Sequence, residues 1–257
     1  MIEYVFPTNI NDRVLVKAAR VLEGGGLAAL PTDVSWNLVC SLKSPTGIKK
    51  LRKLSGERDE RHFTLLCSDI SQFGELCSLD NTRFRLIKRL SPGPYVFILK
   101  TLSGTEKALD IRRREVGVRI PGHPVPLALI NTLGHPLYSI TAKKSMQDDC
   151  MRGVHTPPIR KYVPRDKYLT KTTTPSLRGE VVDMEFFHTA GDVADISEMP
   201  PIPEEDLFEG GWELEGIEGV DLVIDDGEER ERVFSTILDI SGDEIELLRR
   251  GAGAWPA

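Results

Sequence analysis

The sequence has few cysteines, few aromatic residues and no long apolar run. Its 257 residues include four cysteines, none of them arranged as a CxxC pair. Scattered cysteines argue against a disulfide framework or a thiolate zinc site and favour free thiols in a reducing compartment. No stretch reaches the roughly 18 uninterrupted apolar residues of a membrane-spanning helix. The beginning of the chain lacks a basic segment followed by an apolar one, so we expect a cytoplasmic protein without a secretory signal or a membrane partner.

The common signatures of nucleotide, metal and nucleophile sites are also missing. The sequence contains neither GxGxxG nor GxxxxGK[ST], the motifs of the two common phosphate-binding loops. It contains no HExxH, no EF-hand loop and no GxSxG nucleophile elbow. The five histidines show no metal-ligand spacing, so we expect no tightly bound metal ion.

Charge is distributed unevenly along the chain. Residues 1–145 carry 22 basic and 13 acidic side chains, a net charge of +9, whereas residues 146–257 carry 11 basic and 26 acidic ones, a net charge of −15. This asymmetry predicts that the first part faces an anionic partner. The alternative is that the acidic part folds over the basic part, so that the two fields cancel.

Hydrophobic periodicity predicts an α/β protein. The predicted helices are 11–23, one that starts after the Ser44-Pro45 cap signal, 81–90 and 125–133. The predicted strands are 27–30, 63–67, 95–99, 116–120, 137–140, 220–224, 236–240 and 245–248. Because strands return at the end of the chain, the pattern favours one α/β domain whose late strands complete the early sheet.

Proline clusters interrupt this pattern between about residues 146 and 215. We expect an insertion or extension with only short elements there, inside a single domain that spans residues 1–257. The segment is a candidate lid or dimerisation element, which leaves monomer and homodimer open. Its acidic tract Glu204-Glu205-Asp206 is a candidate mask for the basic face when no ligand is bound.

Short motifs in a fixed order carry a resemblance to a known family. Each motif is weak alone, but the ordered series is specific. The motifs are Leu30-Pro31-Thr32-Asp33, Ser91-Pro92-Gly93-Pro94 with the strand after it, Gly117-Val118-Arg119-Ile120-Pro121-Gly122-His123-Pro124, Pro136 to Ala142, and the tail segments 220–227, 235–239 and 248–251. With this series the chain resembles the YrdC/YciO family over nearly its whole length outside 146–215, and segment 61–67 is more similar to the YciO branch.

The resemblance implies a twisted mixed sheet flanked by helices, with a large concave basic face. Members of the YrdC branch make threonylcarbamoyl-adenylate from L-threonine, bicarbonate and ATP, for threonylcarbamoyladenosine modification of tRNA. In this reaction a carbamate oxygen attacks the α-phosphate of ATP, which enters with Mg²⁺ as a substrate complex. Cations and hydrogen-bond donors are the main catalytic resource, and no covalent nucleophile is needed.

The resemblance also assigns ligand-binding residues. Thr32, Arg119, His123 and Ser139 match family positions that contact the substrates, and an arginine such as Arg119 offers phosphate a bidentate contact. Further nucleotide contacts are expected from Ser139, from the late pair Ser235-Thr236 and from a late arginine. Arg249 and Arg250 both fit that last position, and Arg249 is the residue we assign.

Two of four expected catalytic positions depart from the family pattern. The synthase branch carries a Lys-x-Arg pair, and the matching positions here are Lys53 and Ser55. Arg58 or Arg61 is a candidate replacement for the missing cation, contacting substrate or nucleotide, and Lys50-x-Arg52 has the pair farther from the strand. The branch also carries Ser-x-Asn, where this chain has Thr141-Ala142-Lys143. Lysine cannot accept a hydrogen bond as asparagine does.

Three hypotheses therefore remain open at the level of sequence. The first is an ATP-dependent threonylcarbamoyl-adenylate synthase, weak because of the two changed positions. The second is a non-catalytic YciO-like binder of nucleotides or of double-stranded RNA or tRNA, whose RNA affinity falls with salt. The third is a related adenylate-forming reaction on another substrate.

Overall fold

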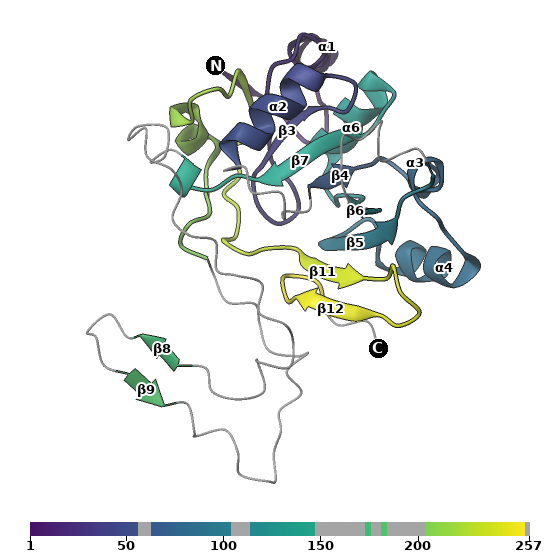
Figure 1. Cartoon of the computed structure of the whole chain (residues 1–257). Helices are drawn as coiled ribbons and strands as arrows, with labels where there is room; N and C mark the ends of the chain where they lie inside the picture. Colours follow the sequence, from purple (N-terminus) through teal and green to yellow (C-terminus); the bar gives the residue numbers. More distant parts are fainter. Residues whose placement is uncertain (56–62, 104–113, 147–172, 176–180, 184–203, 255–257) are drawn as a thin grey trace. The chain divides into compact units, whose positions relative to one another are not determined.

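The computed structural model describes residues 1–55, 63–103, 114–146, 173–175, 181–183 and 204–254 (Figure 1). Residue contacts divide the chain into two units, Met1–Val154 with Pro200–Ala257, and His155–Met199. The second unit lies within the predicted insertion and contains an antiparallel pair of strands, β8 (Thr173–Pro175) and β9 (Val181–Asp183). None of the described helices is long and apolar enough to cross a membrane. The prediction of a single domain stays a prediction.

A mixed β-sheet forms the centre of the first unit. Among the described residues it has ten strands, which follow one another in space as β1 (Ile2–Tyr4), β10 (Leu222–Asp225), β2 (Ala28–Leu30), β3 (Asn37–Ser41), β7 (Leu137–Thr141), β4 (Thr64–Leu66), β6 (Glu115–Arg119), β5 (Tyr95–Lys100), β11 (Thr236–Asp239) and β12 (Glu246–Arg249). Strand β10 lies parallel between β1 and β2, and β11 pairs in parallel with β5. The late strands complete the early sheet, as predicted.

Helices flank this sheet (Figure 1). They are α1 (Asp12–Glu23), α2 (Pro45–Leu54), α3 (Ile70–Leu76), α4 (Asn81–Leu90) and α6 (Pro124–Leu133), with a 3₁₀ helix, η4, at Gly211–Gly216. Local signals set their ends. The Ser44 hydroxyl accepts a hydrogen bond from the backbone N–H of Gly47 at 3.2 Å, and Pro45 occupies the first turn of α2. Gly134 ends α6 with a φ of 68°, which glycine adopts without strain.

Two hydrophobic clusters hold the helices on the sheet. One joins α1 and α6 through residues such as Leu22 and Leu129 to strand residues that include Leu66 and Leu137. The other joins α2, α3 and α4 through Ile48, Leu51, Phe73 and Ile87 to the alternate strand residues, which include Leu38 and Tyr138. Because side chains alternate along a strand, the two clusters occupy opposite faces of the central strands.

The sequence patterns missed β1, β3, α3 and η4. All five residues of β3 are buried, so this strand lacks the alternation of apolar and polar residues that marks a half-exposed strand. Helix α3 has seven residues, fewer than a periodicity window needs. The elements with clear boundaries, such as α1, α2, α4 and α6, agree with the prediction within two residues.

Residues 204–215 belong to the first unit although the sequence placed them in the insertion. Leu207 and Phe208 are buried there, and Leu207 forms an isolated antiparallel bridge with Lys143. The Asp206 carboxylate accepts hydrogen bonds from the backbone N–H of Ser145 at 2.7 Å and from its hydroxyl at 2.9 Å. Asp206 therefore fixes the chain that follows β7, a structural role different from the predicted masking of a basic face.

We expect the Ser44→Ala substitution to lower the free energy of unfolding by about 1 kcal/mol, because α2 loses its N-terminal cap. Ser78→Ala is the matched control, since Ser78 is exposed and lies outside every helix. Chemical denaturation of both variants measures the difference. Equal stability of the two variants would contradict the capping role.

Candidate functional site

A cavity of about 350 Å³ opens on the first unit, where several strands and two loops meet. Its strand residues come from β3, β7, β4, β5, β6, β11 and β12. The rest come from the end of α2, the residue before β4, the chain after β7 and the segment before β11. Seven of the predicted site residues line it. They are Ser55, Arg119, Ser139, Thr141, Lys143, Ser235 and Arg249.

The cavity continues the sheet face that α1 and α6 cover elsewhere. On β7, Ser139 and Thr141 lie two and four residues after Leu137, so their side chains point to the same face of the sheet. On β4, Thr64 lies two residues before Leu66 and shares its face. Thr64 pairs with Ser139 across the two strands. Apolar residues under the helices thus give way to hydroxyl groups farther along the same strands, and these hydroxyls can donate to or accept from a polar ligand.

Arg119 is anchored at the end of β6. Its side chain is 3% exposed, and its Nη2 donates to the Asp33 carboxylate at 2.5 Å. Its Nε donates to the carbonyl oxygen of Gly93 at 3.2 Å. Desolvation lowers the pKa of Arg119, and the charge and hydrogen bond of Asp33 oppose this effect. Asp33 therefore holds a buried guanidinium group in place at the cavity.

Arg249 brings a second guanidinium group to the same cavity from β12. It donates from Nε to the carbonyl oxygen of Ser235 at 3.1 Å and from Nη2 to the Ser235 hydroxyl at 3.2 Å. Its Cζ lies 4.4 Å from the centroid of the Phe234 ring, a cation–π contact. The pKa of Arg249 is lowered to about 10, first by desolvation and then by the positive charge of Arg119, while Glu204 acts in the opposite direction.

These two arginines give the cavity the charge that suits an anionic ligand. Both stay protonated at neutral pH, and they repel each other across a partly dehydrated space. An anionic group between them would relieve this repulsion and accept charge-assisted hydrogen bonds from both. Lys143 adds a third cation at the rim, with its Nζ 5.2 Å from the centroid of the Phe234 ring.

The structure shows where the two candidate late arginines and the changed position Ser55 lie. Arg249 lines the cavity, whereas its neighbour Arg250 is not among the lining residues. Ser55 is the C-cap residue of α2 and also lines the cavity, where its hydroxyl donates to the carbonyl oxygen of Arg52 at 2.8 Å. It supplies no charge in place of the family arginine. Arg58 and Arg61, its candidate replacements, lie outside the described residues.

Four predicted site residues are not among those that line the cavity. Lys53 is exposed on the last turn of α2, whereas the buried side of this helix carries Ile48 and Leu51. The Thr236 hydroxyl donates to the carbonyl oxygen of Gly253 at 2.6 Å and accepts from the N–H of Gly251 at 3.1 Å, so it anchors the chain after β12. Thr32 and His123 are held in local networks.

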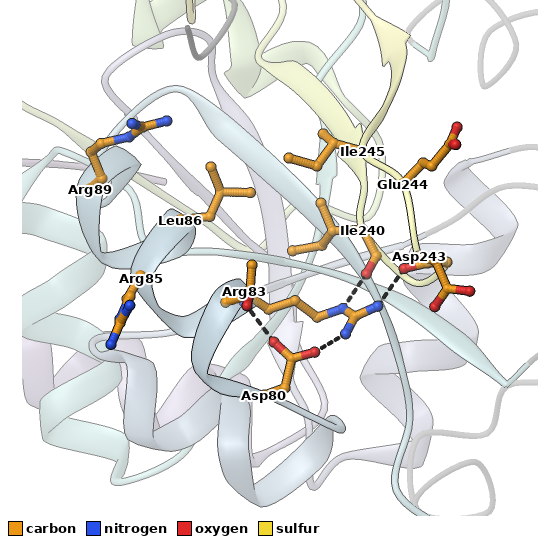
Figure 2. A pocket seen from close by; sticks show the side chains of 11 residues that line it. Asp80, Arg83, Arg85, Leu86, Arg89, Ile240, Asp243, Glu244 and Ile245 are labelled. Atoms are coloured by element: carbon orange, nitrogen blue, oxygen red, sulfur yellow. Dashed lines mark hydrogen bonds and ion pairs between the residues drawn. The ribbon is translucent and has the colours of Figure 1, made fainter.

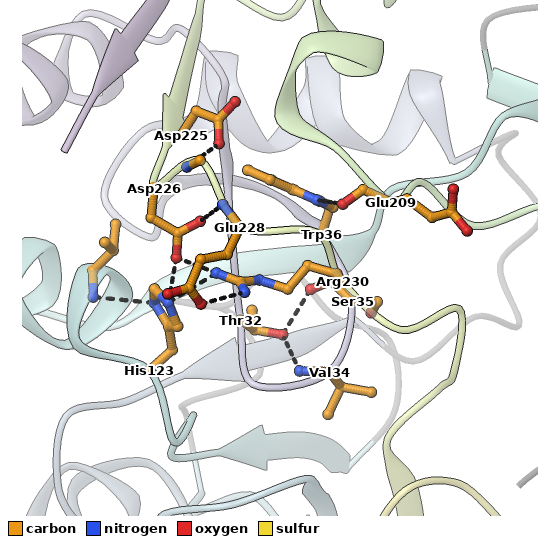
Figure 3. Close-up of polar contacts among 12 residues, drawn as sticks. Thr32, Val34, Ser35, Trp36, His123, Glu209, Asp225, Asp226, Glu228 and Arg230 are labelled. Atoms are coloured by element: carbon orange, nitrogen blue, oxygen red, sulfur yellow. Dashed lines mark hydrogen bonds and ion pairs between the residues drawn. The ribbon is translucent and has the colours of Figure 1, made fainter. Parts of the chain in front are cut away.

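Thr32 and His123 each lie in a hydrogen-bond network (Figure 3), and Asp33, which pairs with Arg119, follows Thr32 in the chain. The Thr32 hydroxyl donates to the carbonyl oxygen of Ser35 at 2.6 Å and accepts from the N–H of Val34 at 3.2 Å. This closes the turn that carries Asp33. Thr32, which was predicted as a substrate contact, therefore has the geometry of a residue that positions Asp33.

His123 caps the start of α6 and is tied to the turn after β10. Its Nδ1 accepts from the N–H of Val125 at 3.3 Å, and its Nε2 lies 2.9 Å from the Asp226 carboxylate and 3.1 Å from Nη2 of Arg230 (Figure 3). Arg230 also pairs with Asp226. This network fixes the chain segment that follows Arg119.

The sequence analysis missed several residues of the cavity. Asn37 and Thr64 are polar members of strands, and Phe63, Val96 and Phe234 form apolar walls. The available signal for Asn37 was a polar residue next to the apolar run Leu38-Val39-Cys40. That run was not recognised as a strand, so the position could not be assigned to a face.

A larger cavity of about 470 Å³ lies between α4 and the turn that joins β11 to β12 (Figure 2). Arg83 faces it, but this guanidinium pairs with Asp80 and donates to the carbonyl oxygens of Ile240, at 2.6 Å, and Gly242. Its donors are used to hold the turn on the helix. Arg85 and Arg89 also line this cavity but are exposed, so solvent screens their charge, and the cavity offers an anion less than the one lined by Arg119 and Arg249.

Among the described residues, no group of three or more histidine, cysteine, aspartate or glutamate side chains is placed to hold a metal ion. The three described cysteines are buried and free. Burial raises the pKa of Cys40 and of Cys77 to about 12, so these thiols are poor nucleophiles.

Asp226 should make stability depend on pH in the acid range. Burial raises its pKa, but the hydrogen bond from His123 and the charge of Arg230 outweigh this, and the net shift is downward. The unfolded chain then binds more protons than the folded one below about pH 4, so the stabilisation is present above that pH and is lost as the pH falls through the lowered pKa. We expect Asp226→Asn to flatten the acid limb of the unfolding free energy between about pH 2 and 5, measured by urea denaturation. An unchanged acid limb would refute this.

Comparisons with known proteins identify the family of this chain. A family model described as telomere recombination, which covers the Sua5, YciO and YrdC proteins, matches residues 20–155. The uncharacterised protein YciO of Escherichia coli K12 is 33% identical over 137 residues, which cover 53% of this chain and 66% of that protein, just under two thirds of its length. A threonylcarbamoyl-AMP synthase of Nitrosococcus oceani is 32% identical over 130 residues, which cover 50% of this chain and 70% of that protein.

Solved structures show the same fold. The crystal structure of E. coli YciO has a TM-score of 0.65 at 23% identity and covers 98% of this chain and 96% of that one. The structure of P. abyssi Sua5 complexed with L-threonine has a TM-score of 0.67 at 18% identity and covers 98% of this chain and 57% of that one. The predicted twisted mixed sheet flanked by helices is therefore confirmed. Since the family model matches more than half of its residues, the chain belongs to the Sua5/YciO/YrdC family.

Proposed function

We propose that the cavity binds ATP, as its Mg²⁺ complex, next to L-threonine, and that the protein forms threonylcarbamoyl-AMP from L-threonine, bicarbonate and ATP. The observation that carries this proposal is the pair of guanidinium groups, buried Arg119 and half-buried Arg249, on one cavity with the hydroxyls of Ser139, Thr141 and Ser235. Relatives that are threonylcarbamoyl-AMP synthases, and a related fold complexed with L-threonine, support the choice of substrates.

The chemistry follows from charge development at phosphorus. The amine of threonine combines with bicarbonate to give a carbamate, with loss of water. A carbamate oxygen then forms a bond to the α-phosphorus, the bond to the bridging oxygen breaks, and pyrophosphate leaves. Negative charge builds on the phosphate oxygens, so preorganised donors from Arg119 and Arg249 would stabilise the transition state. Mg²⁺ enters with ATP and neutralises phosphate charge.

Two positions would limit the rate. Ser55 places a neutral hydroxyl where the synthase pattern has an arginine, and this hydroxyl is already bonded to the carbonyl oxygen of Arg52. Lys143 places a point charge where the pattern has a neutral amide, and it contacts the Phe234 ring. These two changes favour slow turnover.

The same two changes support a second candidate function, a binder that retains the cavity without turnover. Its ligand would be a nucleotide, tRNA or double-stranded RNA, and its RNA affinity would fall steeply as salt rises. A monomer and a homodimer are both compatible with it. A cytoplasmic location remains part of either proposal.

The synthase proposal predicts pyrophosphate release that requires L-threonine and bicarbonate together. We expect slow release by the wild-type protein and faster release by the double variant Ser55→Arg, Lys143→Asn, because the variant restores a cation and an amide at the two changed positions. A coupled pyrophosphate assay measures both rates. Absence of release from both folded proteins, with Mg²⁺ present, would reject the synthase in favour of the binder.

Removal of the charge of Arg249 should weaken ATP binding about 10- to 100-fold, the loss expected for charge-assisted hydrogen bonds worth about 1.5–3 kcal/mol. Arg249→Gln is compared with Arg250→Gln, which makes the same charge change one residue away and outside the cavity lining. Isothermal titration calorimetry gives the two affinities, and thermal unfolding checks the fold of each variant. Equal losses in both variants would show a general charge effect and contradict a specific phosphate site.

A further inference from the structure

Asn37 is a buried polar side chain of the cavity whose hydrogen bonding is incomplete. It is 5% exposed and lines the cavity from β3. Its Nδ2 donates to the hydroxyl oxygen of Ser139 at 3.0 Å. Its Oδ1 is buried and has no hydrogen-bond partner among the described residues. A buried amide oxygen without a hydrogen-bond donor lowers the stability of the folded protein unless a bound molecule supplies the donor.

The contact with Ser139 uses the amide nitrogen of Asn37, so it leaves the carbonyl end of the side chain without a donor. In this orientation Oδ1 is unpaired within the described part of the chain. A buried, unpaired amide end typically costs about 1–3 kcal/mol. A residue that carries such a cost in a ligand cavity has the character of a binding residue rather than of a folding residue.

The position of Asn37 complements that of the two arginines. Asn37 pairs with Thr141 between β3 and β7, whereas Arg119 lies on β6, beyond β4 in the sheet order. The cavity therefore has a cationic end at Arg119 and, two and three strands away on β7 and β3, an end of hydroxyl and amide groups. A ligand that satisfies both ends has an anionic group and, separated from it, an N–H or O–H donor.

We propose that Asn37 determines ligand specificity by accepting, together with Ser139, a hydrogen bond from an N–H or O–H group of the bound substrate. This inference rests on the proposed function and deepens it. Two substrate groups have the required chemistry, the 6-amino group of adenine and the hydroxyl or ammonium group of threonine. In both cases the Asn37 carbonyl oxygen gains its hydrogen-bond donor only when the substrate is bound.

The alternative is that Asn37 only orients Ser139. A structural role would couple stability to binding, because loss of the amide would loosen Ser139, lower the melting temperature and weaken every ligand by the same factor. A binding role has the opposite signature. Removal of an unpaired amide leaves the free protein as stable as before, or more stable, and weakens the complex with one substrate.

The experiment titrates ATP, inosine triphosphate and L-threonine into the wild-type protein, Asn37→Ala and Asn37→Leu by calorimetry, and records the melting temperature of each free protein. Asn131→Ala is the matched control, because Asn131 is exposed on α6. We expect both Asn37 variants to lose at least tenfold in affinity for ATP or for threonine without a lower melting temperature. Asn131→Ala should change neither quantity.

The three ligands distinguish adenine from the amino acid as the source of the hydrogen-bond donor to Asn37. If adenine supplies it, the substitutions weaken ATP and leave inosine triphosphate, which lacks the 6-amino group, unaffected. If the amino acid supplies it, they weaken threonine alone. Affinities within twofold of the wild type, or equal losses that accompany a lower melting temperature, would overturn the role of Asn37 while the proposed function stands. A wild-type protein that binds none of the three ligands would overturn both.

Discussion

Arg119 and Arg249 are two positive charges that the fold brings to one partly dehydrated cavity, and most of the surrounding structure serves to hold them there. Asp33 compensates Arg119, and the turn closed by Thr32 carries Asp33. Arg249 is held by Ser235 and by the face of the Phe234 ring. Neither pairing removes the repulsion between the two guanidinium groups, which lowers the pKa of Arg249. A cavity arranged in this way has unused affinity for an anion.

The sheet explains how residues so distant in sequence meet. Near the end of the chain, β11 pairs with β5 and β12 pairs with β11, while β3, β7 and β4 form the other side of the cavity. One face of the central strands is apolar under α1 and α6, and becomes polar where Thr64, Ser139 and Asn37 lie. The same alternation of side chains thus builds the core and the site. The changed positions Ser55 and Lys143 lie on this cavity too, so the features that favour catalysis and those that limit it share one location.

Local signals allowed much of the fold and part of the site to be predicted from the sequence. The helix ends at Ser44 and Gly134 depend on neighbouring residues, so the sequence shows them directly. The two motifs that contain Arg119 and Ser139 each supplied a residue that lines the cavity. Thr32 bonds within its own turn, so its place beside Asp33 gave no sign of its partners, and the contact of His123 with Asp226, 103 residues away, is tertiary. Asn37 escaped prediction because β3 is buried along its whole length and shows no period of two.

The most direct test of the account is a crystal structure of the protein in complex with Mg²⁺ and a non-hydrolysable ATP analogue. The account predicts phosphate oxygens within hydrogen-bond distance of the guanidinium groups of both Arg119 and Arg249. A nucleotide whose phosphates lie elsewhere, such as in the larger cavity beside Arg83 and Arg89, would contradict it.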